Sequence, residues 1–210
     1  MKNKVRLGFA GANVNSVWAS ESHFPALMAH PDVEMTAVCT TRAESAEEAK
    51  KAFGAKFAFH DYRTMVASPE IEAVVAVVRV PAHFEVAKAA IEAGKPVYIE
   101  WPLGRTTAEA EELAALAKAK GVINVVGLQS RVSPSLMYAR ELVQAGHIGE
   151  LISAHATSIR GGPIERPSSR THGADVNWGG NPLTVHTGHC IDTLEYVCGD
   201  FARLSCGLST

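Results

Sequence analysis

The sequence predicts an α/β protein whose N-terminal part is a doubly wound parallel sheet. Two observations carry this prediction. Short runs rich in β-branched residues alternate with alanine-rich segments of helical period over the first 127 residues, and glycines stand where those helices should end. Strands that alternate with helices of about 10–15 residues form βαβ units, which build parallel sheets. We therefore expect a first domain over residues 1–127 and a second over residues 128–210.

The elements of the first domain can be read in order along the chain. Strands are expected over Lys4–Ala10, Val33–Thr40, Ala73–Val78, Pro96–Glu100 and Gly121–Val126. Helices are expected from His23 onward and over Ala43–Phe53, Ala82–Ala93 and Thr107–Lys120. Gly54, Gly94 and Gly121 each follow a helical run, as helix-ending glycines do.

The second domain has fewer elements. The pattern predicts helices over Ser133–Ala145 and His186–Val197, and strands over Leu151–Ile159 and Phe201–Leu208. Residues 161–182 are rich in Gly, Pro, Ser and Arg and are expected to form a long loop. Because two strands and two helices make a poor stand-alone domain, we expect this domain to be incomplete or to depend on a partner.

Composition excludes several classes of protein. The net charge of −2 offers no bulk basic field, so we expect no nucleic-acid partner. The apolar runs are too short to span a bilayer and no signal peptide is recognisable, so we expect no membrane partner. The four cysteines contain no CxxC pair, which favours a reduced, cytoplasmic protein.

The turn after the first strand resembles a phosphate-binding loop. In the dinucleotide fingerprint G-x-G-x-x-G, the three glycine positions would be Gly11, Asn13 and Ser16, so only the first glycine is present. Asn13 tolerates a left-handed conformation, Ser16 is small, and Asn and Ser side chains can donate to a phosphate. An ordinary βα turn is the alternative, but the surrounding βαβ pattern favours a dinucleotide site.

The end of the second predicted strand bears on the choice of cofactor. An NAD site calls for an acidic residue at this position, whereas the chain has Thr40, Thr41 and Arg42. A guanidinium and hydroxyls suit a 2′-phosphate, so NADP(H) is favoured and NAD(H) remains possible. The alternative is a helix-capping threonine followed by a solvated arginine.

Three later segments, taken with this turn, carry a resemblance to a known family. They are Val80-Pro81-Ala82-His83, Tyr98-Ile99-Glu100-Trp101-Pro102-Leu103-Gly104 and Gly188-His189-Cys190-Ile191-Asp192. In this order they resemble the glucose–fructose oxidoreductase / inositol dehydrogenase / MocA family. The resemblance implies a Rossmann domain followed by an α/β domain with a large, open, mostly antiparallel sheet, which would be truncated here. It also implies NAD(P) chemistry on sugars and cyclic polyols.

The resemblance and the turn together define a candidate cofactor site. Its expected members are Gly11, Asn13, Asn15, Ser16, Trp18, Thr40, Thr41, Arg42, Val80, Pro81, His83, Glu100, Trp101 and Gln129. Glu100 is expected to contact the nicotinamide ribose, and Pro102 to follow a cis peptide bond. His83 could lie beside the cofactor or cap its helix. Arg131, near the domain junction, is expected to be structural.

The candidate catalytic residues are His189 and Asp192. Their i, i+3 spacing places them on one helix face, where the aspartate could orient the imidazole for proton transfer. A buried structural histidine is the alternative. Two family residues are absent, because the lysine of the E-K-P signature is Trp101 and the aspartate four residues before the histidine is Val185. A zinc site at His186, His189 and Cys190 is rejected, because no fourth ligand is placed, and no metal is expected.

We therefore predict an NADP(H)-dependent oxidoreductase acting on a small sugar-like or polyol substrate. The alternatives are a dinucleotide-binding regulator without turnover and an inactive truncated form. The regulator is favoured by Trp101 and by similarity to the family branch that includes the galactose-pathway co-repressor. An arginine-rich loop, with Arg160, Arg166, Arg170 and His172, could reach over the site. Because the second domain would expose an unpaired edge strand with Leu204 and Leu208, we expect a homo-oligomer or a longer natural form.

Overall fold

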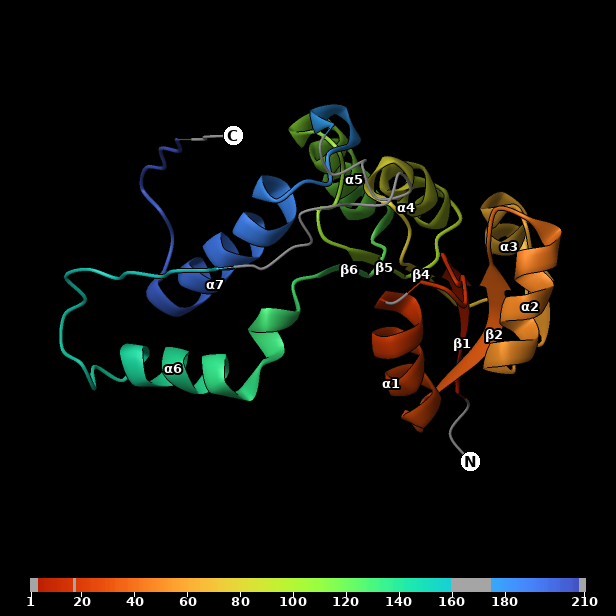
Figure 1. Ribbon diagram of the computed structural model, residues 1–210, viewed down its shortest axis with the longest axis horizontal. Helices are drawn as coiled ribbons and strands as arrows, with labels where there is room; N and C mark the ends of the chain where they lie inside the picture. The colour runs from red at the N-terminus through yellow and green to blue at the C-terminus, as the bar shows by residue number, and fades with distance from the viewer. Residues whose placement is uncertain (1–3, 17, 160–174, 208–210) are drawn as a thin grey trace. The chain divides into compact units, whose positions relative to one another are not determined.

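The computed structural model describes residues 4–16, 18–159 and 175–207 and divides into two compact units (Figure 1). The first unit comprises residues 1–127 with Val176–Gly180, and the second comprises Leu128–Asp175 with residues 181–210. In the part of the chain that the structure describes, no helix is long and apolar enough to cross a membrane.

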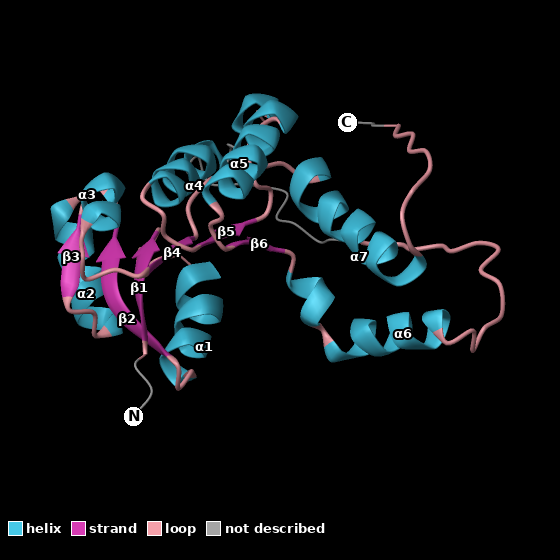
Figure 2. Cartoon of the chain, turned by 180° about the vertical axis from the view of Figure 1, so that it is seen from behind, coloured by secondary structure: helices cyan, strands magenta, loops and turns pink. Residues whose placement is uncertain are grey.

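The first unit is built on one six-stranded parallel sheet with the order β3-β2-β1-β4-β5-β6 (Figure 2). The strands are β1 (Val5–Ala10), β2 (Val33–Cys39), β3 (Phe57–Phe59), β4 (Ala73–Ala76), β5 (Val97–Glu100) and β6 (Asn124–Gly127). Because β1 pairs with both β2 and β4, the strand order reverses at β1. Ligands of open α/β sheets bind outside the carboxyl ends of the strands at such a reversal.

Helices cover both faces of this sheet. They are α1 (Phe24–Ala29), α2 (Ala43–Phe53), α3 (Tyr62–Ala67), α4 (His83–Glu92) and α5 (Thr107–Lys120). Since side chains alternate along a strand, neighbours in β1 belong to different cores. Phe9 packs with α1 and α2, whereas Ala10 packs in the cluster formed with α3, α4 and α5.

Local signals explain where these helices begin and end. Asp61 caps α3 by accepting from the Arg63 N–H, and Thr106 caps α5 by accepting from the Glu109 N–H. The predicted helix-ending glycines are confirmed, with φ angles of +67°, +70° and +62° at Gly54, Gly94 and Gly121. The predicted strands of the first unit are also confirmed, although β6 begins at Asn124 because Gly121 still caps α5. The short β3 and α3 were not predicted.

The second unit contains α6 (Pro134–Gln144) and α7 (Gly188–Cys198), which pack against each other (Figure 1). A 3₁₀ turn (Gln129–Val132) precedes α6, and a π-helical turn (Leu183–Thr187) precedes α7. Both predicted helices are confirmed.

The two strands predicted for the second unit are wrong. Residues 151–159 and 201–207 have no regular secondary structure, and Leu208 lies outside the described residues. Ile152 and Ile159 are 94% and 90% exposed. A strand needs a partner, and residues 128–159, 175 and 181–207 contain no other strand to pair with, so the expected antiparallel sheet is not formed there. Arg160, Arg166, Arg170 and His172 also lie outside the described residues.

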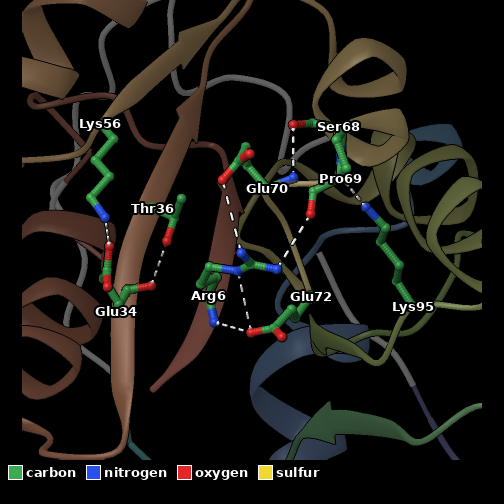
Figure 3. A network of polar contacts seen from close by, with 9 residues as sticks. All are labelled: Arg6, Glu34, Thr36, Lys56, Ser68, Pro69, Glu70, Glu72 and Lys95. Atoms are coloured by element: carbon green, nitrogen blue, oxygen red, sulfur yellow. Dashed lines mark hydrogen bonds and ion pairs between the residues drawn. The ribbon is translucent and has the colours of Figure 1, made fainter. Parts of the chain in front are cut away.

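A polar network occupies the amino ends of the strands in the first unit (Figure 3). The Arg6 guanidinium lies near the carboxylates of Glu70 and Glu72, at 3.9 and 3.5 Å, and the Arg6 backbone N–H donates to Glu72. Lys95 donates to the Ser68 carbonyl at 2.6 Å. This network lies at the amino ends of the strands and the candidate site lies at their carboxyl ends, so the network does not belong to the candidate site.

Candidate functional site

Gly11 shapes the turn that follows β1. Its φ is +92°, and a Cβ built there would lie 2.0 Å from the Val77 carbonyl oxygen. Its backbone N–H donates to the Cys39 carbonyl at 2.9 Å. The turn is therefore held between the ends of β2 and β4, and glycine is the residue that fits there.

In the rest of the turn, backbone N–H groups donate to oxygen atoms of the turn itself. The Asn13 side-chain oxygen accepts from the Asn15 N–H at 2.8 Å, and the Ser16 N–H donates to the Asn13 carbonyl at 2.9 Å. Asn13 does not take the left-handed conformation that its residue type permits. No described residue other than glycine has a positive φ. Within the described part of the chain, no hydrogen bond uses the side-chain amides of Asn13 and Asn15 or the Ser16 hydroxyl as a donor. A tight-turn glycine followed by such donors fits the phosphates of a dinucleotide.

The three residues that follow β2 divide into two groups. Thr40 is buried, and its hydroxyl bonds the Arg42 carbonyl at 2.9 Å and the Ser45 hydroxyl at 2.7 Å. It therefore shapes the entry into α2 rather than facing a ligand, and α2, whose N-cap is Arg42, has no side-chain cap. Thr41 and Arg42 are exposed. They are the members of this group that can reach a ligand phosphate.

Glu100, the last residue of β5, lies in a cluster of donors. Its Oε1 accepts from His23 Nε2 and from the Tyr98 hydroxyl, each at 2.8 Å. Burial raises the pKa of Glu100. The hydrogen bonds from His23, Tyr98 and Trp18, together with the electrostatic effect of His23, lower this pKa by more than burial raises it. The net pKa lies below the ordinary value, so the carboxylate is ionised at neutral pH. Burial and the neighbouring carboxylate raise the pKa of Tyr98.

His83 begins α4 and is 1% exposed. Its Nδ1 lies 2.6 Å from the Pro102 carbonyl oxygen, and its Nε2 lies 2.9 Å from the Val78 carbonyl oxygen. It therefore joins the loops that follow β4 and β5, and its side chain does not cap the helix. The Trp101–Pro102 peptide bond in this loop is cis, as expected.

The segment Val176–Gly180 packs on the same loops of the first unit. The Arg79 guanidinium lies 6.0 Å from the ring of Trp178. A Cβ built at Gly180 would lie 3.0 Å from Val80, which forms a 3₁₀ turn with Pro81 after β4. Nothing in the sequence pattern predicted that this distant segment would contact the end of β4.

In the second unit, Arg131 holds Asp192. Arg131 Nε donates to Asp192 Oδ1 at 2.7 Å, and its Nη2 lies 3.7 Å from Glu195. Asp192 Oδ2 is buried without a hydrogen-bond partner among the described residues. The Asp192 carboxylate is therefore held by Arg131 within the second unit. Gln129 lies on the preceding 3₁₀ turn.

Sequence reasoning missed His23 and Tyr98. Their positions on a helix after the turn and on a strand next to Glu100 were visible, but their contacts depend on the three-dimensional fold. Among the described residues, no group of three or more His, Cys, Asp or Glu is arranged to hold a metal ion.

Comparison with known proteins agrees with this geometry. Residues 5–128 match the model of an oxidoreductase family with an NAD-binding Rossmann fold, named for glucose–fructose oxidoreductase, inositol dehydrogenase and MocA. The chain belongs to this family. Residues 134–210 match the model of the Gal80p C-terminal domain, so the predicted resemblance, including its branch, is confirmed.

Individual relatives include dehydrogenases and a regulator. The dehydrogenase aclE of Aspergillus oryzae is 31% identical over 97% of this chain and 57% of its own length. A structure of a super-repressor mutant of Gal80p from Saccharomyces cerevisiae has a TM-score of 0.80 at 27% identity, over 92% of this chain and 52% of that one. KijD10, a 3-ketoreductase from Actinomadura kijaniata in complex with NADP, has a TM-score of 0.63 at 28% identity, over 70% and 46%. The chain spans about half the length of the curated relatives it matches.

Proposed function

We propose that the first unit binds NADP(H) at the carboxyl edge of its sheet and that the protein is an oxidoreductase of a sugar-like or polyol substrate. The observation that carries this proposal is the Gly11 turn at the strand-order reversal, with Thr41 and Arg42 exposed at the end of the neighbouring strand and no carboxylate among them. The NADP complex of the related KijD10 supports the choice of cofactor.

Each part of the site has a role in this proposal. Arg42 pairs with the 2′-phosphate, and the Asn13, Asn15 and Ser16 side chains donate to the pyrophosphate. Glu100 accepts from a ribose hydroxyl. Trp18, Val80, Pro81, Trp101 and Gln129 line the nicotinamide half, and His83 orders the two loops around it.

The bound nicotinamide supplies the hydride chemistry. The proton is assigned to His189, because Trp101 cannot carry one. Asp192 contributes by holding Arg131 and the start of the second unit in place. Cytoplasmic location and homo-oligomerisation remain predictions from the sequence.

A regulator without turnover is the second candidate. It is favoured by Trp101 in place of the family lysine and by the match of residues 134–210 to the Gal80p C-terminal domain. Both candidates require dinucleotide binding, and they differ in catalysis.

The test begins with fluorescence titration of the chain with NADPH and NADH. We expect tighter binding of NADPH, and Arg42→Ala should remove about 1–3 kcal/mol of that preference, the usual value of a charge-assisted hydrogen bond. Lys120→Ala is the matched control. It removes a positive charge at the C-terminal end of α5, which lies by the amino ends of the strands and not by their carboxyl ends. Equal binding of both cofactors would exclude the 2′-phosphate assignment.

A panel of sugars and polyols then separates the two candidates. Turnover with any of them supports the oxidoreductase. Cofactor binding without turnover across the panel favours the regulator.

A further inference from the structure

We propose that His23 is a positioning residue that fixes the carboxylate of Glu100 for the nicotinamide half of the dinucleotide; this inference rests on the proposed function. His23 ends the π-helical turn Trp18–His23, directly after the phosphate-binding turn, while Glu100 ends β5. The 2.8 Å contact between them therefore joins the two parts of the site that the two halves of a dinucleotide would occupy.

The ring of His23 contacts three aromatic rings. The rings of Phe9, Trp18 and Tyr98 lie edge-on to it, with centroid distances of 5.9, 5.9 and 5.7 Å. The side chain of His23 is 15% exposed. Because its rotation is restricted by this packing, Nε2 presents its donor to Glu100 in one direction.

A second donor acts on the same carboxylate oxygen. The Tyr98 hydroxyl donates to Oε1 as His23 does, and the Trp18 side chain is a further hydrogen-bond donor to this carboxylate. Gly127, paired with Glu100 in the sheet, leaves room for this arrangement, since a Cβ there would lie 2.5 Å from the Tyr98 oxygen. A carboxylate held in this way is a pre-oriented acceptor for a ribose hydroxyl.

Fold stability alone is a poor account of this cluster. A buried ion pair is weak evidence for stability, because apolar residues of similar size are often as stabilising or more so. The ion pairs of Arg6 with Glu70 and Glu72, whose side chains are 38–50% exposed, show that this fold also forms charged contacts with less burial. A histidine–carboxylate contact with side chains only 15% and 12% exposed, at the carboxyl ends of the strands where ligands of such sheets bind, is better explained by positioning.

The experiment compares two ligands in the full chain. NADPH carries both halves of the dinucleotide, and adenosine 2′,5′-bisphosphate carries only the adenosine half; NADH and AMP replace them if the wild type prefers NADH. We expect His23→Leu to weaken NADPH binding by about tenfold or more, the value of one hydrogen bond to a charged group, and to leave adenosine 2′,5′-bisphosphate binding unchanged. His23→Gln, whose amide can donate where Nε2 did, should restore NADPH affinity to within about threefold of wild type.

Two further variants make the result decisive. His30→Leu is the matched control, because His30 is exposed in the same unit at the end of α1, by the amino ends of the strands, and it should change neither affinity. Tyr98→Phe removes one donor while keeping the ring, and it carries the test if His23→Leu does not fold; it should weaken NADPH alone, by about threefold or more.

Three outcomes would overturn the inference. Unchanged NADPH affinity in His23→Leu, or in Tyr98→Phe where that variant carries the test, would refute the positioning role alone. An equal loss for both ligands would show a general disturbance of the fold. A wild-type chain that binds neither NADPH nor NADH would overturn the proposed function and this inference with it.

Discussion

Replacing Gly11 by alanine should damage the first unit more than any other glycine substitution at a helix or strand end. The added Cβ would lie 2.0 Å from the Val77 carbonyl oxygen and 2.6 Å from its carbon, both backbone atoms at the end of β4. Ordinary van der Waals contact begins near 3.4 Å, so β4 and the turn must separate by more than 1 Å. Such a shift would disturb the hydrogen bonds from the turn to Cys39.

The cost has two parts that can be separated. A positive φ costs a residue with a Cβ about 1–2 kcal/mol, and overpacking typically costs about 1–3 kcal/mol more. We therefore expect Gly11→Ala to lower the free energy of unfolding by about 3 kcal/mol or more. Gly54→Ala isolates the first part, because Gly54 has a φ of +67° with no atom within 4 Å of the added Cβ. It should cost only about 1 kcal/mol.

The assay is urea unfolding followed by circular dichroism, with NADPH titration as a second readout. Gly11→Ala should unfold at clearly lower urea concentration than Gly54→Ala and should lose NADPH binding. If both variants are destabilised equally, the close approach of the turn to β4 is not present and the argument for Gly11 fails.

Three other predictions concern charged residues. The folded pKa of Glu100 lies below its ordinary value of 4.5, so the carboxylate stabilises the fold above that value and loses this effect as pH falls through the folded pKa. The difference in unfolding free energy between wild type and Glu100→Gln should therefore shrink from about pH 5 downward; a constant difference would contradict the pKa direction. Arg131→Ala should destabilise the second unit by about 1.5–3 kcal/mol in urea unfolding, because the substitution leaves the buried carboxylate of Asp192 unpaired. The same substitution should cost less in an Asp192→Asn background; if it costs the same in both backgrounds, the two residues are not coupled. If turnover is found, His189→Ala should reduce kcat by about a hundredfold or more while NADPH binding is kept, and undiminished turnover would refute its role as proton donor.

The first unit could be predicted from the sequence because its signals are local. Buried parallel strands are continuous apolar runs, and the glycines at positive φ end the helices where they were expected. The two elements that escaped prediction, β3 and α3, are three and six residues long, too short for a period to be recognised. The strands predicted over residues 151–159 and 201–208 are absent from the described residues 151–159 and 201–207 for the opposite reason. Alternation was present, but a strand forms only with a neighbour, and sequence alternation does not supply one.

The candidate site shows where local reasoning ends. The residues of the Gly11 turn and the strand ends could be named because sheet topology brings them to one edge. Which side chain holds which carboxylate could not be inferred, since this depends on residues far apart in sequence. Glu100 is held by His23, 77 positions earlier, and Asp192 is held by Arg131, 61 positions earlier. Helical spacing shows only that two side chains can meet, whereas a buried carboxylate takes the donor that long-range packing presents to it. Substituting the distant partner is therefore the sharper test of each assignment.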